Sequence, residues 1–140
     1  MGLAEAYRGA VRAQECEPSG RMRPEGVIAR VWDGVPNLRN RGGGIGGREE
    51  GLGSAALEYR LVHLAPLAAG QLVTVTSGLS ALGEKTTTWT HLLHDGETGA
   101  PVAAAQAVGV AFDLAARRAV PIPPDRRAAL AALLVPGIGL

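Results

Sequence analysis

The chain has 140 residues, which is enough for one domain with its own core and too short for two ordinary domains. A formal net charge of +1 excludes the large positive excess of a nucleic-acid binder, and 46% hydrophobic residues exclude a disordered chain. Cys16 is the single cysteine, so no internal disulfide forms. We see no signal peptide and no run near the ~20 apolar residues of a membrane helix, and expect a cytoplasmic protein without membrane or nucleic-acid partners.

Two features of the composition stand out. Aromatic residues make up only 4% of the chain and glycine reaches 20 residues, so the core must be aliphatic and the backbone permissive in places. Lys85 is the single lysine among the 14 basic residues, which is typical of GC-rich bacterial coding.

The first third of the chain contains a strand pattern followed by a helix pattern. Residues 7–15 alternate as a half-buried strand does, and turn residues follow at positions 17–20. Apolar residues at helical spacing then predict a helix over residues 24–35, with Pro24 at its first position. Pro36 predicts that this helix ends or kinks near Gly34.

Residues 39–54 are rich in glycine and have almost no apolar side chains, which predicts a flexible loop. The segment lacks the Gly-Lys-Ser/Thr ending of a phosphate-binding loop. It also follows a helix and precedes a strand, the reverse of the order in a dinucleotide fingerprint.

Four strands are expected in the second half, over residues 57–63, 72–79, 85–94 and 102–114. Asp95-Gly96-Glu97-Thr98-Gly99 is a strong hairpin signal between the last two. One face of the last strand consists only of alanine and glycine, which lets another element approach closely, and the apolar helix is the natural occupant. Residues 124–140 are expected to form a C-terminal helix and tail, with the helix over residues 126–134.

This order of elements, in one domain spanning residues 1–140, resembles the α+β hot-dog fold, in which an antiparallel sheet of about five strands wraps around one central helix. Glu17-Pro18-Ser19-Gly20 is similar to the Asp-x-x-Gly turn before the central helix in thioesterases of the 4-hydroxybenzoyl-CoA type. The runs Leu57-Glu58-Tyr59-Arg60-Leu61, Trp89-Thr90-His91 and Ala107-Val108-Gly109-Val110-Ala111-Phe112-Asp113 resemble the acyl-CoA and acyl-carrier-protein thioesterase branches.

The resemblance implies hydrolysis of an acyl thioester, with coenzyme A or phosphopantetheine as part of the substrate and no separate cofactor. Glu17 is the candidate base or nucleophile, and the amides around Gly20, Arg21 and Met22 are candidate donors to the oxyanion. The chain departs from the family in having glutamate for aspartate, and Gly20-Arg21-Met22-Arg23-Pro24 where the family has a run such as Gly-His-Val-Asn-Asn.

Further candidates have simpler structural interpretations beside the functional ones. Glu25 is a rival base or a complement to the helix dipole. Trp32 lines an acyl pocket or belongs to the core. Four exposed groups are candidates to hold coenzyme A phosphates or are simply solvated: Lys85, Thr86, Arg117 and Arg118.

The three histidines, His63, His91 and His94, lie on predicted strands without metal-ligand spacing, so we expect no metal site and interpret each as a hydrogen-bonded strand residue. Hot-dog dehydratases use a histidine in or before the central helix, and none is present there. A dehydratase or hydratase is therefore a weaker alternative than a non-catalytic acyl-binding or structural hot-dog protein. A long free strand edge predicts a homodimer, or a homotetramer built from two dimers.

Overall fold

The computed structural model describes residues 3–41 and 51–138. The chain forms β1 (Ala4–Ala10), the 3₁₀ turn η1 (Ala13–Glu15) and the long helix α1 (Pro24–Arg41). Four strands follow: β2 (Leu52–His63), β3 (Leu72–Leu82), β4 (Thr86–Asp95) and β5 (Pro101–Asp113). The short strand β6 (Arg118–Ala119) and the helix α2 (Pro124–Ala131) complete the described chain.

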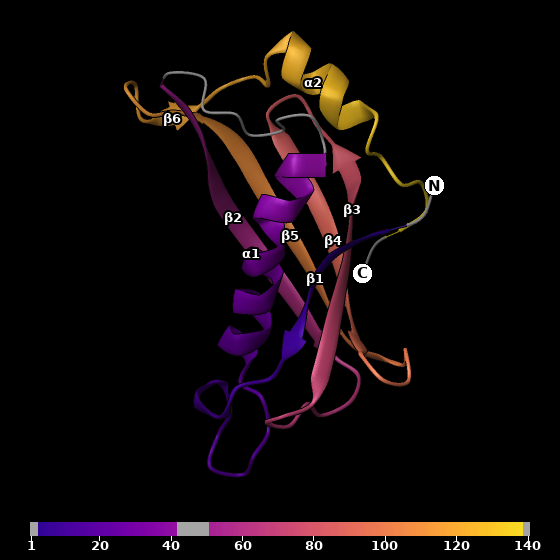
Figure 1. The fold of residues 1–140 in the computed structure, drawn as a ribbon. Helices are drawn as coiled ribbons and strands as arrows, with labels where there is room; N and C mark the ends of the chain where they lie inside the picture. The colour runs from indigo at the N-terminus through magenta and orange to yellow at the C-terminus, as the bar shows by residue number, and fades with distance from the viewer. Residues whose placement is uncertain (1–2, 42–50, 139–140) are drawn as a thin grey trace.

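The strands form one antiparallel sheet in the order β1-β3-β4-β5-β2, and β6 pairs with β5. Figure 1 shows α1 lying along one face of this sheet. The loop before α1 and the helix α2 lie at opposite ends of the molecule. This is the hot-dog arrangement expected from the sequence, and all four strands of the second half are confirmed.

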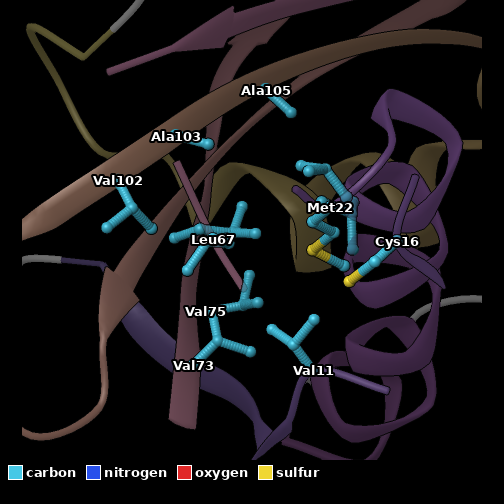
Figure 2. Packing of buried hydrophobic residues seen from close by; sticks show 12 residues of the cluster. Val11, Cys16, Met22, Leu67, Val73, Val75, Val102, Ala103 and Ala105 are labelled. Carbon is cyan, nitrogen blue, oxygen red and sulfur yellow. The ribbon is translucent and has the colours of Figure 1, made fainter. Parts of the chain in front are cut away.

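The first half of the alanine and glycine face of β5 packs against α1, as the sequence predicts, while Ala111 further along it packs with Leu130 of α2. Ala103 and Ala105 are buried in one cluster with Val27 and Val31 of the helix. Short side chains on the strand let the helix come close, so the core is filled by valine and leucine with few aromatic rings. Figure 2 shows this cluster extending to Cys16 and Met22, whose sulfur atoms point into it.

A second, smaller cluster lies at the other end of the sheet. Leu130 of α2 packs there with Leu79, Ala111 and Ile122. The C-terminal helix is therefore part of the fold rather than a loose tail, and it begins two residues earlier than expected, at Pro124.

The first predicted strand is correct only in its first half. β1 covers Ala4–Ala10, and residues 13–15, predicted as strand, form the 3₁₀ turn η1. The carboxylate of Glu15 accepts a hydrogen bond from the amide of Arg12 at 3.0 Å, which closes this turn. The alternation of apolar and polar residues in the sequence continues across residues 11–15, which predicted a strand. The hydrogen bond between the Glu15 carboxylate and the Arg12 amide favours a turn instead.

The predicted end of α1 near Gly34 is wrong. The helix continues through Pro36 to Arg41. Gly34 does not end the helix but permits close packing, because a Cβ there would lie 2.9 Å from the Cβ of Ala6 on β1. Pro36 removes one backbone hydrogen bond on an exposed turn, and the helix tolerates it.

The expected flexible loop over residues 39–54 is shortened at both ends. Residues 39–41 belong to α1, and β2 begins at Leu52. The remaining glycine-rich part, residues 42–50, lies outside the described residues.

Candidate active site

The candidate base, Glu17, lies in a tight hairpin between η1 and α1. Cys16 and Met22 form an antiparallel bridge at the base of the hairpin. The amide of Gly20 donates to the carbonyl of Glu17 at 2.8 Å, and the amide of Glu17 donates to the carbonyl of Arg21 at 2.8 Å. Gly20 has φ of +87°, so a residue with a side chain would be strained there, and glycine lets the hairpin close.

The hairpin is anchored to the segment that follows β2. The amide of Met22 donates to the carbonyl of Leu67 at 2.7 Å, and Arg21 forms a bridge with Ala68. Met22 and Leu67 are both buried in the main core. These contacts fix the position of the hairpin, while the Glu17 side chain itself is exposed.

A cavity of about 420 Å³ opens between the hairpin, the first turn of α1 and the end of β2. Its polar side chains are Glu17, Arg21 and His63. Its remaining wall is mostly apolar and is formed by Met22, Pro24, Val27, Leu64, Ala65, Pro66, Leu67 and Ala103. An apolar cavity with a few polar groups at its walls is typical of a small-molecule site.

The three amides expected to stabilise an oxyanion are not equivalent. Those of Gly20 and Met22 already donate to backbone carbonyls of the protein. The amide of Arg21 makes no such bond within the part of the chain that the structure describes. Of the three predicted donors, Arg21 is therefore the one whose amide has no backbone partner among the described residues.

His63 also faces the cavity, and the sequence interpretation missed this role. It is the last residue of β2 and pairs with Ala103 of β5, which lines the same cavity. The register was the missing information, because the strand pattern alone does not show which neighbour a terminal residue faces. Its exposed ring differs from that of His91, which is buried.

Two of the predicted substrate-binding residues lie on α1 outside this cavity. Glu25 is exposed in the first turn, with an oxygen 3.9 Å from Nε of Arg23. Trp32 is 48% exposed and meets the ring of Tyr59 on β2 edge to face, with centroids 6.4 Å apart. Trp32 is therefore not a core residue. Partial burial of the Tyr59 hydroxyl beside it raises the pKa of Tyr59.

The predicted phosphate-binding residues lie at the opposite end of the sheet from Glu17. The carbonyl of Lys85 accepts a bond from Ala111, Thr86 begins β4, and Arg118 pairs with Asp113. Arg117 precedes β6 in a left-handed conformation, with φ of 56°. Eight to ten residues of β5 separate them from Ala103, which is about 30 Å at the usual rise of a strand. Within one chain they do not contact the cavity.

The other two histidines are held within the sheet. Nδ1 of His91 and Oγ of Ser77 are 2.6 Å apart in the core, and Nε2 of His94 and Oγ1 of Thr76 are 3.2 Å apart. Their interpretation as hydrogen-bonded strand residues is confirmed. Among the described residues, no three His, Cys, Asp or Glu side chains gather closely enough to hold a metal ion.

Cys16 is buried beside the hairpin and donates a weak bond from Sγ to the carbonyl of Arg12 at 3.5 Å. None of the helices in the described ranges combines the length and apolar character that a membrane crossing requires.

The sequence model of the thioesterase-like superfamily matches residues 29–130, which is most of the chain. The chain therefore belongs to the thioesterase-like superfamily. No curated protein sequence matches it.

The fold is also that of solved thioesterase structures. A predicted thioesterase from Bacillus stearothermophilus is 19% identical, with a TM-score of 0.82 over 96% of this chain and 98% of that one. A Staphylococcus aureus protein in complex with CoA is 18% identical, with a TM-score of 0.81 over 95% and 85%. A 1,4-dihydroxy-2-naphthoyl-CoA thioesterase from Synechocystis is 14% identical, with a TM-score of 0.78 over 94% and 98%. At these identities, the likeness establishes the fold.

Proposed function

We propose that the protein hydrolyses the thioester of an acyl-CoA or an acyl-carrier protein, with Glu17 as the catalytic carboxylate. The observation that carries this proposal is the position of Glu17 on the wall of this cavity, beside Arg21 and the first turn of α1. Membership of the thioesterase-like superfamily supports the reaction class, and the CoA complex of a protein with the same fold supports the substrate class.

The reaction would follow one of two routes. In the first, Glu17 removes a proton from a water molecule as its oxygen attacks the thioester carbonyl carbon. The carbon–sulfur bond then breaks, and the proton held by Glu17 passes to the departing thiolate. In the second, the Glu17 carboxylate attacks directly, and water hydrolyses the resulting anhydride. Both routes give a carboxylic acid and a free thiol, and neither requires a resident cofactor.

The developing oxyanion needs a donor already in place. The amide of Arg21, which has no backbone partner among the described residues, would meet this need, and the positive end of the α1 dipole would add to it. The Arg21 side chain also supplies a positive charge at the cavity wall. Apolar residues such as Val27 and Leu67 form the surface on which an acyl chain would lie.

The phosphates of coenzyme A would be bound by a second copy of the chain. β2 is an edge strand of 12 residues, and Leu57 on it is 63% exposed, as is Leu64 beyond it at 57%. Antiparallel pairing of β2 with its own copy would bring the Leu52 end of one strand to the His63 end of the other. This pairing would carry Arg117 and Arg118 of the second copy towards the cavity of the first.

The test is thiol release from a panel of acyl-CoA thioesters of increasing chain length, with the wild-type protein and with Glu17→Gln. We expect the variant to lose at least about 100-fold in kcat, because the amide cannot accept a proton or attack. Glu25→Gln is the matched control, since Glu25 is also a carboxylate near the start of α1 but lies outside the cavity. Release that survives Glu17→Gln and is lost in Glu25→Gln would assign the base to Glu25.

A non-catalytic acyl-binding protein is the second candidate. It is favoured by the run Gly20-Arg21-Met22-Arg23-Pro24, which places no histidine or asparagine in the hairpin or the first turn of α1. Saturable binding of acyl-CoA without thiol release on any chain length would establish this alternative. Hydration of an enoyl-CoA would instead establish the weaker hydratase alternative, with His63 as the histidine in the cavity.

A further inference from the structure

A buried ionic cluster joins η1 to α1 behind the hairpin of Glu17. Arg30 on α1 is at its centre, and its side chain is only 7% exposed. Its Nε lies 3.0 Å from Oε2 of Glu15, and its Nη1 lies 2.9 Å from Oδ2 of Asp33 and donates to the hydroxyl of Tyr7 at 2.8 Å. Burying a guanidinium and a carboxylate is costly unless the two are paired, so this cluster requires an explanation.

Glu15 is bonded at the base of the hairpin through both its side chain and its backbone. Its Oε1 accepts from the amide of Arg12, and its carbonyl accepts from the amide of Arg23 at 2.8 Å. Glu15 and Arg23 flank the hairpin on either side, so this backbone bond closes its neck. Contacts that fix Glu15 therefore also fix the hairpin, and Glu17 lies in that hairpin, two residues after Glu15.

The helix presents a matching face to Glu15. Gly26 and Arg30 are four residues apart and so lie on the same side of α1. A Cβ at Gly26 would be 3.3 Å from both the Cβ and the carbonyl oxygen of Glu15, so the glycine allows the turn to rest against the helix. Arg30 then holds the carboxylate one helical turn further along.

The Glu15–Arg30 contact acts through charge. Oε2 of Glu15 and Nε of Arg30 are close together, but neither makes a well-aligned hydrogen bond. Burial lowers the pKa of Arg30, but the hydroxyl of Tyr7 and the carboxylates of Glu15 and Asp33 outweigh it, so the pKa is raised overall. Arg30 is therefore positively charged at neutral pH.

We propose that Glu15 and Arg30 are positioning residues, which hold the hairpin against α1 so that Glu17 faces the reacting carbon. This inference rests on the proposed function, because it concerns the same carboxylate. An error of about 1 Å in the position of a catalytic group is enough to lower the rate about 100-fold. A hairpin held in a fixed position would therefore give a higher kcat.

The experiment compares Glu15→Gln with Asp33→Asn. Glu15→Gln keeps the shape of the side chain and removes its charge, whereas Asp33→Asn removes a carboxylate from the same arginine without touching η1. We expect kcat to fall about 10-fold in Glu15→Gln with KM within about twofold, and both to be unchanged in Asp33→Asn. Amide hydrogen exchange should become faster in residues 13–23 of Glu15→Gln only. If Glu15→Gln does not fold, Arg30→Lys replaces it. The lysine leaves the buried Glu15 a cation, which favours folding, but a single ammonium does not reproduce the guanidinium contacts to Glu15, Asp33 and Tyr7, so the same pattern is expected.

Two results would overturn the proposal. One is unchanged kcat in a folded Glu15→Gln protein. The other is equal loss of kcat in both variants with faster exchange throughout the chain, which indicates only a less stable fold. If the wild-type protein releases no thiol from any thioester, the proposed function fails, and the catalytic part of this inference fails with it. Exchange over residues 13–23 then still decides whether the pair holds the hairpin.

Discussion

A neutral imidazole is built into the core at His91, beside Ser77. His91 is 3% exposed, and this burial lowers the pKa of its ring from 6.5 to about 4. Burial penalises the charged imidazolium, so the folded protein takes up its proton at a lower pH than the unfolded chain does.

This difference predicts a loss of stability in weak acid. Between pH 6.5 and about 4 the unfolded chain binds a proton at His91 that the folded protein does not, so stability falls as the pH falls through this window. The full effect is about 3 kcal/mol at 1.36 kcal/mol per pKa unit. Urea unfolding at pH 7, 6, 5 and 4 measures it, and His91→Gln should flatten the dependence. An equally steep dependence in the variant would assign the effect to other groups.

The second histidine of interest, His63, has a different environment because it faces the cavity. We expect it to hydrogen-bond the polar arm of a bound thioester. His63→Ala should raise KM roughly 5- to 10-fold and leave kcat within about twofold, since one hydrogen bond contributes about 1 kcal/mol to binding. His94→Ala is the control, because His94 lies on the opposite face of the sheet. A fall in kcat at constant KM would instead give His63 a role in the chemical step.

At the scale of elements, the packing of α1 on β1 depends on the absence of a side chain at Gly34. A Cβ at this position would lie 2.9 Å from the Cβ of Ala6 and 3.4 Å from its backbone. Gly34→Val should therefore destabilise the protein by about 1–3 kcal/mol, despite removing a glycine from a helix. Thermal unfolding measures this, with the exposed Asn37→Ala as a control that should not be destabilising. A neutral Gly34→Val would show that β1 moves away at no cost.

The same position shows what the sequence could and could not predict. Periodicity located α1 and the four later strands, because burial of one face requires apolar residues at regular spacing. It also identified the alanine face of β5 and its occupant. Periodicity failed where a single contact decides the conformation. Gly34 packs against β1 instead of ending the helix, and the hydrogen bond of the Glu15 carboxylate to the Arg12 amide forms the turn η1 in place of a strand.

The candidate site was predictable only in part, for a related reason. Glu17 was found from a turn motif, and the motif is local. The position of His63 at the cavity and the lack of a backbone partner for the Arg21 amide depend on which strands pair and which amides are already bonded, and a local motif shows neither. Nothing in the sequence indicated the buried cluster around Arg30, since an arginine at position 30 resembles any exposed helix residue in a sequence pattern.

For the whole molecule, the distribution of exposed apolar groups indicates where a second copy would bind. Leu57 lies at a bulge of β2, Leu64 lies just beyond its end, and Trp32 of α1 packs on Tyr59 of the same strand. An edge strand of this length with apolar neighbours is an open template for strand pairing. Because the cavity also opens at the end of β2, pairing there would complete the site with residues from the second copy.

Leu57→Lys tests this arrangement. A charge at the centre of the edge should convert a dimer to monomers in analytical ultracentrifugation, since two lysines would face each other across a two-fold axis. Leu72→Lys is the matched control, because Leu72 is a 45% exposed leucine beside the opposite edge strand, β1. The monomer should also bind coenzyme A at least about 10-fold more weakly, because Arg117 and Arg118 of the second copy are lost from each cavity. A monomeric wild-type protein would contradict the arrangement outright, whereas a monomeric Leu57→Lys with unchanged affinity would keep the dimer and remove the phosphate role from these arginines.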